Sequence, residues 1–278
     1  MTSLQTKTKK FKDFYESSVW KFHPTVNIYE RIRLRNLFEF LAPKSTDILL
    51  DAGCGGGTYT KHLAKVSTVI ATDISKKALQ NAKRELSELY EQIRYIVCDN
   101  EYLPLRDNSV DKIACIDVIE HIVNVKASLR EMARVSKSHG RISMFTACGR
   151  NKFTLEHILE PVLGKFINLI RSKSGHVHIF STQNLCRLLQ PDFVVVKIQY
   201  MHHWLGCFAK FLWDLSYLSL PESCSRLPAS KNPILSMFSR VLWLMLEAEY
   251  KLLKDASSGS EIVVNAYAKE TMHACFPN

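Results

Sequence analysis

Carboxylate side chains recur in the first half of this 278-residue chain, each close to the end of a short apolar run. These acids are Asp51, Asp73, Asp99 and Asp117, and glycines at 53, 55, 56 and 57 follow the first of them. Carboxylates accept hydrogen bonds from hydroxyl and amino groups. Glycines let a ligand approach the main chain closely. The combination predicts a site for a nucleotide-like ligand.

Histidine side chains supply the candidates for proton transfer. His121 follows the fourth acid closely, and His176 and His178 stand further along the chain. Histidine has a pKa suited to taking a proton from a hydroxyl group. Each of these histidines also fits a purely structural, hydrogen-bonding role, so both interpretations stay open. His121 and His176 are the first candidates for a general base.

The glycine run lies between an expected strand and an expected helix. Residues 48–50 read as a short buried strand, and residues 58–66 carry apolar side chains at helical spacing. A dinucleotide fingerprint requires glycine or alanine where Thr58 stands, so that pattern is broken. The sequence reads instead as DxGxGxG, formed by Asp51, Gly53, Gly55 and Gly57.

Strands and helices alternate regularly from residue 47 to residue 148, as in a doubly wound parallel α/β sheet. Polar side chains follow successive strands, and Asp73, about 20 residues beyond the glycine loop, is placed to accept hydrogen bonds from ribose hydroxyls. The seven expected strands lie at residues 48–50, 67–72, 93–98, 112–118, 140–147, 193–200 and 262–268.

The ordered motifs resemble those of class I S-adenosylmethionine-dependent methyltransferases, over roughly residues 45–200 and the last strand. Residues 174–185 resemble a segment of small-molecule methyltransferases, including quinone-biosynthesis O-methyltransferases. The resemblance implies a Rossmann-like, seven-stranded, mostly parallel sheet whose last strand is antiparallel. It also implies S-adenosylmethionine as the cofactor, with Asp99 and Asn100 at the adenine and Asp117 near the methionine part. Methyl transfer would then be direct and in line.

A long apolar insertion departs from the resembled family, which needs only a turn between its last two strands. Two apolar stretches, residues 204–220 and 234–253, predict an inserted pair of helices. Charged residues interrupt both, and neither has the roughly 20 apolar residues of a membrane span. The expected organisation is a helical segment at 1–46, a methyltransferase core at 47–202, an apolar helical insertion at 203–258, and a last strand and tail at 259–278.

The net charge and the cysteine pattern indicate the kind of partner and the cellular compartment. The formal net charge of +10 favours anionic partners, although an ordinary basic enzyme is equally consistent with it. The eight cysteines are scattered without a CxxC pair, which predicts free thiols and no metal site. The start of the chain does not read as a signal peptide. We therefore expect a cytoplasmic protein, peripheral to a membrane if the insertion contacts lipid.

Several functional alternatives remain at this stage. The step after the fourth expected strand reads Asp117-Val118-Ile119-Glu120 and lacks an Asn-Pro-Pro-Tyr-like motif, so we expect a small or lipid-like acceptor and no nucleic acid. A non-catalytic S-adenosylmethionine-binding module and an NAD(P)-dependent oxidoreductase are the alternatives. The 203–258 insertion packs on the core, lines a lipophilic pocket with membrane contact, or forms a homodimer interface.

Overall fold

The computed structural model describes residues 28–149, 161, 164, 175–201, 203–207, 233–253, 255–256 and 258–270. At residues 28, 29, 233–240, 242 and 243 only the backbone is described. The chain forms two compact units. The first comprises residues 1–146, 182–198 and 264–278, and the second comprises residues 147–181 and 199–263.

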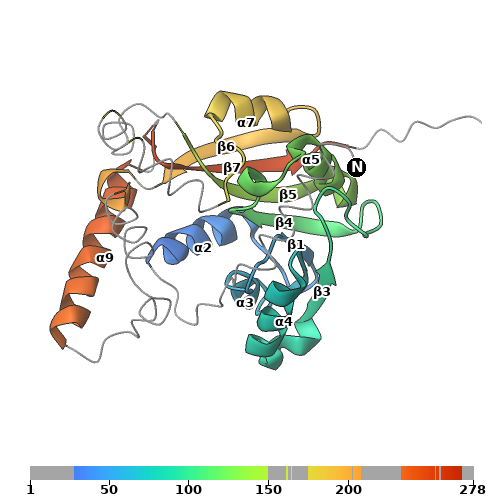
Figure 1. Cartoon of the computed structure of the whole chain (residues 1–278), viewed down its shortest axis with the longest axis horizontal. Helices are drawn as coiled ribbons and strands as arrows, with labels where there is room; N and C mark the ends of the chain where they lie inside the picture. The colour runs from blue at the N-terminus through green and yellow to red at the C-terminus, as the bar shows by residue number, and fades with distance from the viewer. Residues whose placement is uncertain are drawn as a thin grey trace, which may run out of the picture. The chain divides into compact units, whose positions relative to one another are not determined.

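A seven-stranded sheet organises the fold, with the strand order β3-β2-β1-β4-β5-β7-β6 (Figure 1). Its strands are β1 (Ile48–Ala52), β2 (Thr68–Asp73), β3 (Ile93–Val97), β4 (Val110–Ile116), β5 (Ser136–Ala147), β6 (Phe193–Met201) and β7 (Glu261–Ala268). The pairs β1–β2, β2–β3, β1–β4 and β4–β5 are parallel, and β7 is antiparallel. The predicted doubly wound, mostly parallel sheet is confirmed.

Helices pack along this sheet: α3 and α4 contact β2, α2 contacts β4, and α5 contacts α7 (Figure 1). The helices are α2 (Ile28–Leu41), α3 (Thr60–Leu63), α4 (Lys76–Glu85), α5 (Val125–Val135), α7 (Thr182–Leu189) and α9 (Pro233–Leu253), with 3₁₀ turns η1 (Ser87–Gln92) and η2 (Ile119–His121). Ser75 accepts a hydrogen bond from the amide of Ala78 at 3.1 Å and caps α4, as its type and place predict.

The core lies around the central strands. Leu49 and Leu50 of β1 and Ile113 of β4 are fully buried. Strands covered on both faces read as continuous apolar runs, and polar groups are then expected at their ends. Leu50 pairs with Ile70 of β2 and with Ile113 of β4. The carboxyl ends of β1, β2 and β4 therefore lie along one edge of the sheet.

The predicted start of the fifth strand was wrong. The strand was expected at residues 140–147, but β5 already begins at Ser136. The register shifts between the pairs Val110–Ser136 and Lys112–Arg141, which marks a bulge. His139 adopts a φ of +58° there. The bulge lets the strand continue through residues whose types favour a turn.

The insertion is described in part. The helix expected at residues 234–253 is α9, and residues 204–207 are helical where the other helix was expected to begin. Residues 208–220 of that expected helix lie outside the described residues. Glu249 of α9 accepts hydrogen bonds from the amides of Leu205 (2.5 Å) and Gly206 (2.9 Å). Within the described ranges, no helix has the length and hydropathy needed to cross a bilayer.

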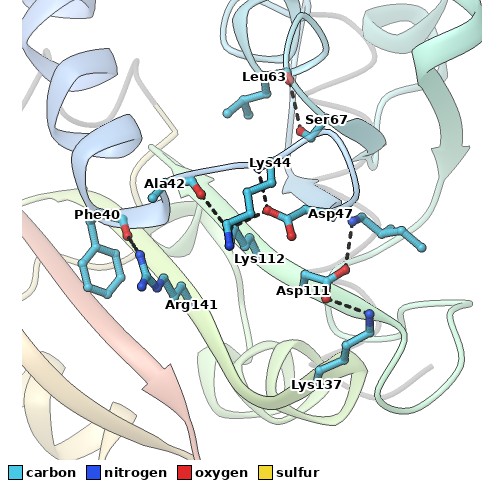
Figure 2. Close-up of polar contacts among 11 residues, drawn as sticks. Phe40, Ala42, Lys44, Asp47, Leu63, Ser67, Asp111, Lys112, Lys137 and Arg141 are labelled. Carbon is cyan, nitrogen blue, oxygen red and sulfur yellow. Dashed lines mark hydrogen bonds and ion pairs between the residues drawn. The ribbon is translucent and has the colours of Figure 1, made fainter.

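A buried ion pair ties α2 to the amino-terminal edge of the sheet (Figure 2). Lys112 Nζ lies 2.6 Å from Asp47 Oδ2 and donates to the carbonyl of Ala42 at 2.8 Å. The amide of Lys44 donates to the same carboxylate oxygen. Burial raises the pKa of Asp47, but the hydrogen bonds from Lys112 and Lys44 outweigh it and lower that pKa from its ordinary value of 3.8.

We predict that Lys112→Met lowers the free energy of unfolding by about 3 kcal/mol at neutral pH, because Asp47 then keeps a buried charge without its cation. Urea denaturation measures the loss. Lys137→Met is the control, since its pair with Asp111 is more exposed and its loss stays below about 1 kcal/mol. Because the pKa of Asp47 is depressed, the effect of Lys112→Met fades as the pH falls below 3.8. Equal losses in both variants would contradict this.

Candidate functional site

The glycine loop follows β1 with three residues in left-handed backbone. Gly53, Gly55 and Gly57 have φ values of +77°, +53° and +88°. A Cβ atom at Gly53 would meet the side chain of Val118, and one at Gly57 would meet Leu86 at 2.9 Å. A Cβ at Gly55 would have no described atom within 4 Å. Packing therefore requires glycine at 53 and 57, whereas Gly55 borders space that no described atom fills.

Asp73 ties the glycine loop to the end of β2. Its Oδ2 accepts a hydrogen bond from the amide of Gly55 at 2.8 Å, and its Oδ1 accepts one from the amide of Ser75 at 2.9 Å. The amides of Gly53 and Cys54 both donate to the carbonyl of Thr72 at 2.8 Å. The predicted ribose acceptor and the predicted loop are thus joined directly.

Asp51 lies beneath the loop and is 3% exposed. Its Oδ2 accepts a hydrogen bond from Thr60 Oγ1 of α3 at 2.6 Å. Burial raises the pKa of Asp51 to about 6; the Thr60 hydrogen bond lowers it and the charge of Asp73 raises it further. With its carboxylate turned to Thr60, Asp51 joins the end of β1 to the helix after the loop.

The expected adenine-side residues form a second cluster after β3. Asp99 Oδ1 accepts a hydrogen bond from the amide of Glu101 at 2.9 Å. Asn100 is 7% exposed, and its Oδ1 accepts one from Thr72 Oγ1 at 3.2 Å. Glu101 in turn accepts from the amide of Asn124, the residue that caps α5, at 2.8 Å. These bonds connect the loop after β3 to β2 and to α5.

An ion pair stands at the end of β4. Asp117 follows the strand directly, with a φ of +55°. Arg33 of α2 contacts its carboxylate through two nitrogens, with Nη1–Oδ2 at 2.6 Å and Nη2–Oδ1 at 3.1 Å. Such two-point contacts fix orientation as well as charge. The pair places a cation and an anion side by side at the carboxyl edge of the sheet.

Sequence reasoning missed Arg33. It lies 84 residues from Asp117 and belongs to no motif. The sequence gives one sign of a cation near the site: arginines occupy three alternate positions, 31, 33 and 35, of the expected N-terminal helical segment. That spacing does not say which of the three turns toward the site.

The two candidate bases lie in different units. His121 ends η2 in the first unit, is half-buried, and its amide donates to the carbonyl of Val118 at 2.9 Å. The neighbouring Glu120 is buried and accepts a hydrogen bond from Thr146 Oγ1 at 2.8 Å. His176 is half-buried in the second unit.

The arrangement in the first unit fits an adenosyl amino acid such as S-adenosylmethionine. Carboxylate and amide oxygens after β2 and β3 suit hydroxyl and amino donors, and Gly55 leaves space beside them. Arg33 and Asp117 offer one charge of each sign to a zwitterion. Ligands of open α/β sheets bind at this carboxyl edge.

Comparison with known proteins agrees with this fit. Residues 50–144 match the family described as "Methyltransferase domain". The ubiquinone biosynthesis O-methyltransferase of Nitrosomonas europaea is 31% identical over 122 residues, covering 43% of this chain and 52% of that protein. The chain therefore spans about half the length of the curated relatives it matches.

Solved structures share the fold across nearly the whole chain. The [4+2]-cyclase SpnF superposes with a TM-score of 0.62 at 16% identity, covering 97% of each chain. The geranyl diphosphate C-methyltransferase of Streptomyces coelicolor A3(2) gives a TM-score of 0.60 at 16% identity, covering 96% of this chain and 98% of that one. At such identities the likeness concerns the fold alone.

The raised pKa of Asp51 predicts a pH dependence of stability. The folded state holds a proton on Asp51 up to about pH 6, whereas the unfolded chain releases it near 3.8. The contribution of Asp51 to stability therefore falls as the pH rises from about 4 to about 6, by up to roughly 3 kcal/mol. Asp51→Asn removes this fall while keeping an acceptor for Thr60, and urea unfolding from pH 4 to 7 measures it. A constant difference between wild type and Asp51→Asn across that range would refute the prediction, and Asp107→Asn is the exposed control.

Proposed function

Because this chain carries a methyltransferase domain of the class I S-adenosylmethionine-dependent family, we propose that it transfers a methyl group from S-adenosylmethionine to a small or lipid-like acceptor. The observation that supports the proposal is the glycine loop, which leaves space at Gly55 and is hydrogen-bonded to Asp73. Asn100 and Asp117 follow the neighbouring strands β3 and β4. These groups lie at one edge because their strands are parallel neighbours.

The cofactor roles follow from the chemistry of each side chain. We assign Gly53, Gly55 and Gly57 to the loop along the cofactor, with Asp51 supporting that loop from below. Asp73 accepts from the ribose hydroxyls, and Asp99 with Asn100 binds the adenine. Asp117 binds the ammonium of the methionine part, and Arg33 binds its carboxylate. Each assignment matches a donor or charge on the cofactor to the acceptor or opposite charge in the first unit.

When bound, S-adenosylmethionine supplies a methyl group already activated by the positive charge on sulfur. The chain then needs to orient donor and acceptor in line and to exclude water. His121 follows the end of β4 closely and is the first candidate to take a proton from an acceptor hydroxyl. His176 is the second candidate.

The alternatives make different demands on the site. A nicotinamide-dependent oxidoreductase is disfavoured by Thr58, which breaks the dinucleotide fingerprint. A non-catalytic module would keep the cofactor site without turnover. The fold itself does not separate these cases, since it is shared with the [4+2]-cyclase SpnF. The proposed acceptor is not a nucleic acid, because the step after β4 lacks an Asn-Pro-Pro-Tyr-like motif.

The cofactor assignment predicts two losses of binding. Gly55→Arg fills the open space beside the loop and strains a left-handed residue, so calorimetry should detect no S-adenosylmethionine binding. Asp73→Ala removes a charged acceptor and weakens binding about 10- to 100-fold. Asp107→Ala, outside the site, is the control and leaves affinity unchanged. Unaltered affinity in both variants, or wild-type protein that binds NAD in place of S-adenosylmethionine, refutes the assignment.

We further propose that the 203–258 insertion serves the acceptor by contacting a membrane surface. Helix α9 exposes Val241, Leu244, Met245 and Leu252, by 49%, 58%, 47% and 82%. Apolar side chains on one side of a helix insert into the headgroup boundary of a bilayer, and a basic protein is attracted to anionic lipids. The net charge of +10 favours such a surface.

Membrane contact is tested by vesicle sedimentation. The double variant Leu244→Gln, Leu252→Gln should bind vesicles containing phosphatidylglycerol at least about fivefold more weakly, because two exposed apolar anchors are lost. The control is Val194→Gln with Val196→Gln, which replaces two half-exposed apolar residues of β6. Equal vesicle binding by both double variants contradicts the proposal. Dissociation of a dimer in the α9 variant would instead support a subunit interface.

A further inference from the structure

Tyr59 occupies a special place between the glycine loop and α3. It follows the loop closely and directly precedes Thr60, the first residue of α3. Its side chain is half-buried, and its Oη accepts a hydrogen bond from Arg33 Nη1 at 3.2 Å. The same nitrogen lies 2.6 Å from Asp117. Side chains from α2, the loop and the end of β4 therefore meet at one point of the first unit.

The hydroxyl of Tyr59 keeps a hydrogen to donate. A phenol carries one donor and two acceptor lone pairs, whereas a guanidinium only donates. The bond from Arg33 therefore uses a lone pair of Tyr59 and does not use its O–H. In the described part of the chain, this bond is the one hydrogen bond of the Tyr59 hydroxyl.

The surroundings keep that hydroxyl protonated. Burial raises the pKa of Tyr59 well above its ordinary value of 10, and the charges of Asp117 and Glu30 raise it too. The charge and hydrogen bond of Arg33 act in the opposite direction and do not compensate. Tyr59 is thus a neutral donor beside a fixed cation.

We propose that Tyr59 donates its hydroxyl hydrogen to the carboxylate of the amino-acid end of S-adenosylmethionine, forming a carboxylate clamp with Arg33. The inference rests on the proposed function and adds a cofactor residue to it. A cation together with a neutral donor recognises a carboxylate, and Asp117 beside them suits the ammonium of the same zwitterion. A second cation at position 59 would compete for Asp117, and a phenol does not.

The test compares two ligands that differ at one group. S-adenosylmethionine carries the carboxylate, and decarboxylated S-adenosylmethionine lacks it while keeping the ammonium and the sulfonium. By calorimetry, Tyr59→Phe should raise the dissociation constant for S-adenosylmethionine about tenfold, since a hydrogen bond to a charged group is lost. It should leave affinity for the decarboxylated ligand within about twofold. Tyr90→Phe, the same change at a residue 60% exposed in η1, is the matched control and alters neither.

A double-mutant cycle separates direct contact from support of Arg33. If Tyr59 touches the carboxylate itself, Tyr59→Phe still weakens S-adenosylmethionine binding at least about threefold in an Arg33→Met background. No further loss in that background would show that Tyr59 acts only through Arg33 and would overturn the proposal.

The other possible results of the calorimetry also test the proposed clamp. Equal weakening of both ligands by Tyr59→Phe would mean a general disturbance of the loop, and no change with either would mean no contact; each overturns the clamp. Binding of the decarboxylated ligand itself reports a folded site in the variant. Wild-type protein that binds neither ligand would defeat the proposed function, a result distinct from failure of Tyr59 alone.

Discussion

Parallel pairing of buried strands is the constraint from which the site follows. β1 lies between β2 and β4 in parallel register, with Leu50 opposite both Ile70 and Ile113. These strands are apolar on both faces, so polar groups gather beyond their ends. Parallel strands bring those ends to one edge, and residues far apart in the sequence become neighbours there.

Gathering several carboxylates at one edge creates repulsion that the chain must offset. Asp73 is offset by the amides of Gly55 and Ser75, and Asp117 by the two-point contact with Arg33. Asp51, the most buried of the set, accepts a hydrogen bond from the hydroxyl of Thr60, and burial raises its pKa. Among the described residues, neutral donors and the cation Arg33 thus stabilise the acidic edge. The same donors and acceptors are the groups that a polar cofactor would engage.

The segment that matches the methyltransferase family lies within one of the two units. The family match, residues 50–144, falls within the first unit, which also holds Arg33, Tyr59 and Asp117. The second unit contains α9 and the residues around His176. The fold does not determine the reaction, because a [4+2]-cyclase and a C-methyltransferase share it.

The amino-acid sequence alone predicts the succession of strands and helices along the chain, the glycine loop and the polar residues that follow each strand. These features are local, because burial and backbone freedom show directly as apolar runs and glycines. It did not determine the bulge before Gly140, because pairing with β4 overrode the turn signal of residues 138–140. Nor did it indicate Arg33 and Tyr59, whose partners lie 84 and 26 residues away. Those contacts are visible in the folded chain alone, because an ion pair or a side-chain hydrogen bond between elements depends on how the elements pack and leaves no periodic pattern in the sequence.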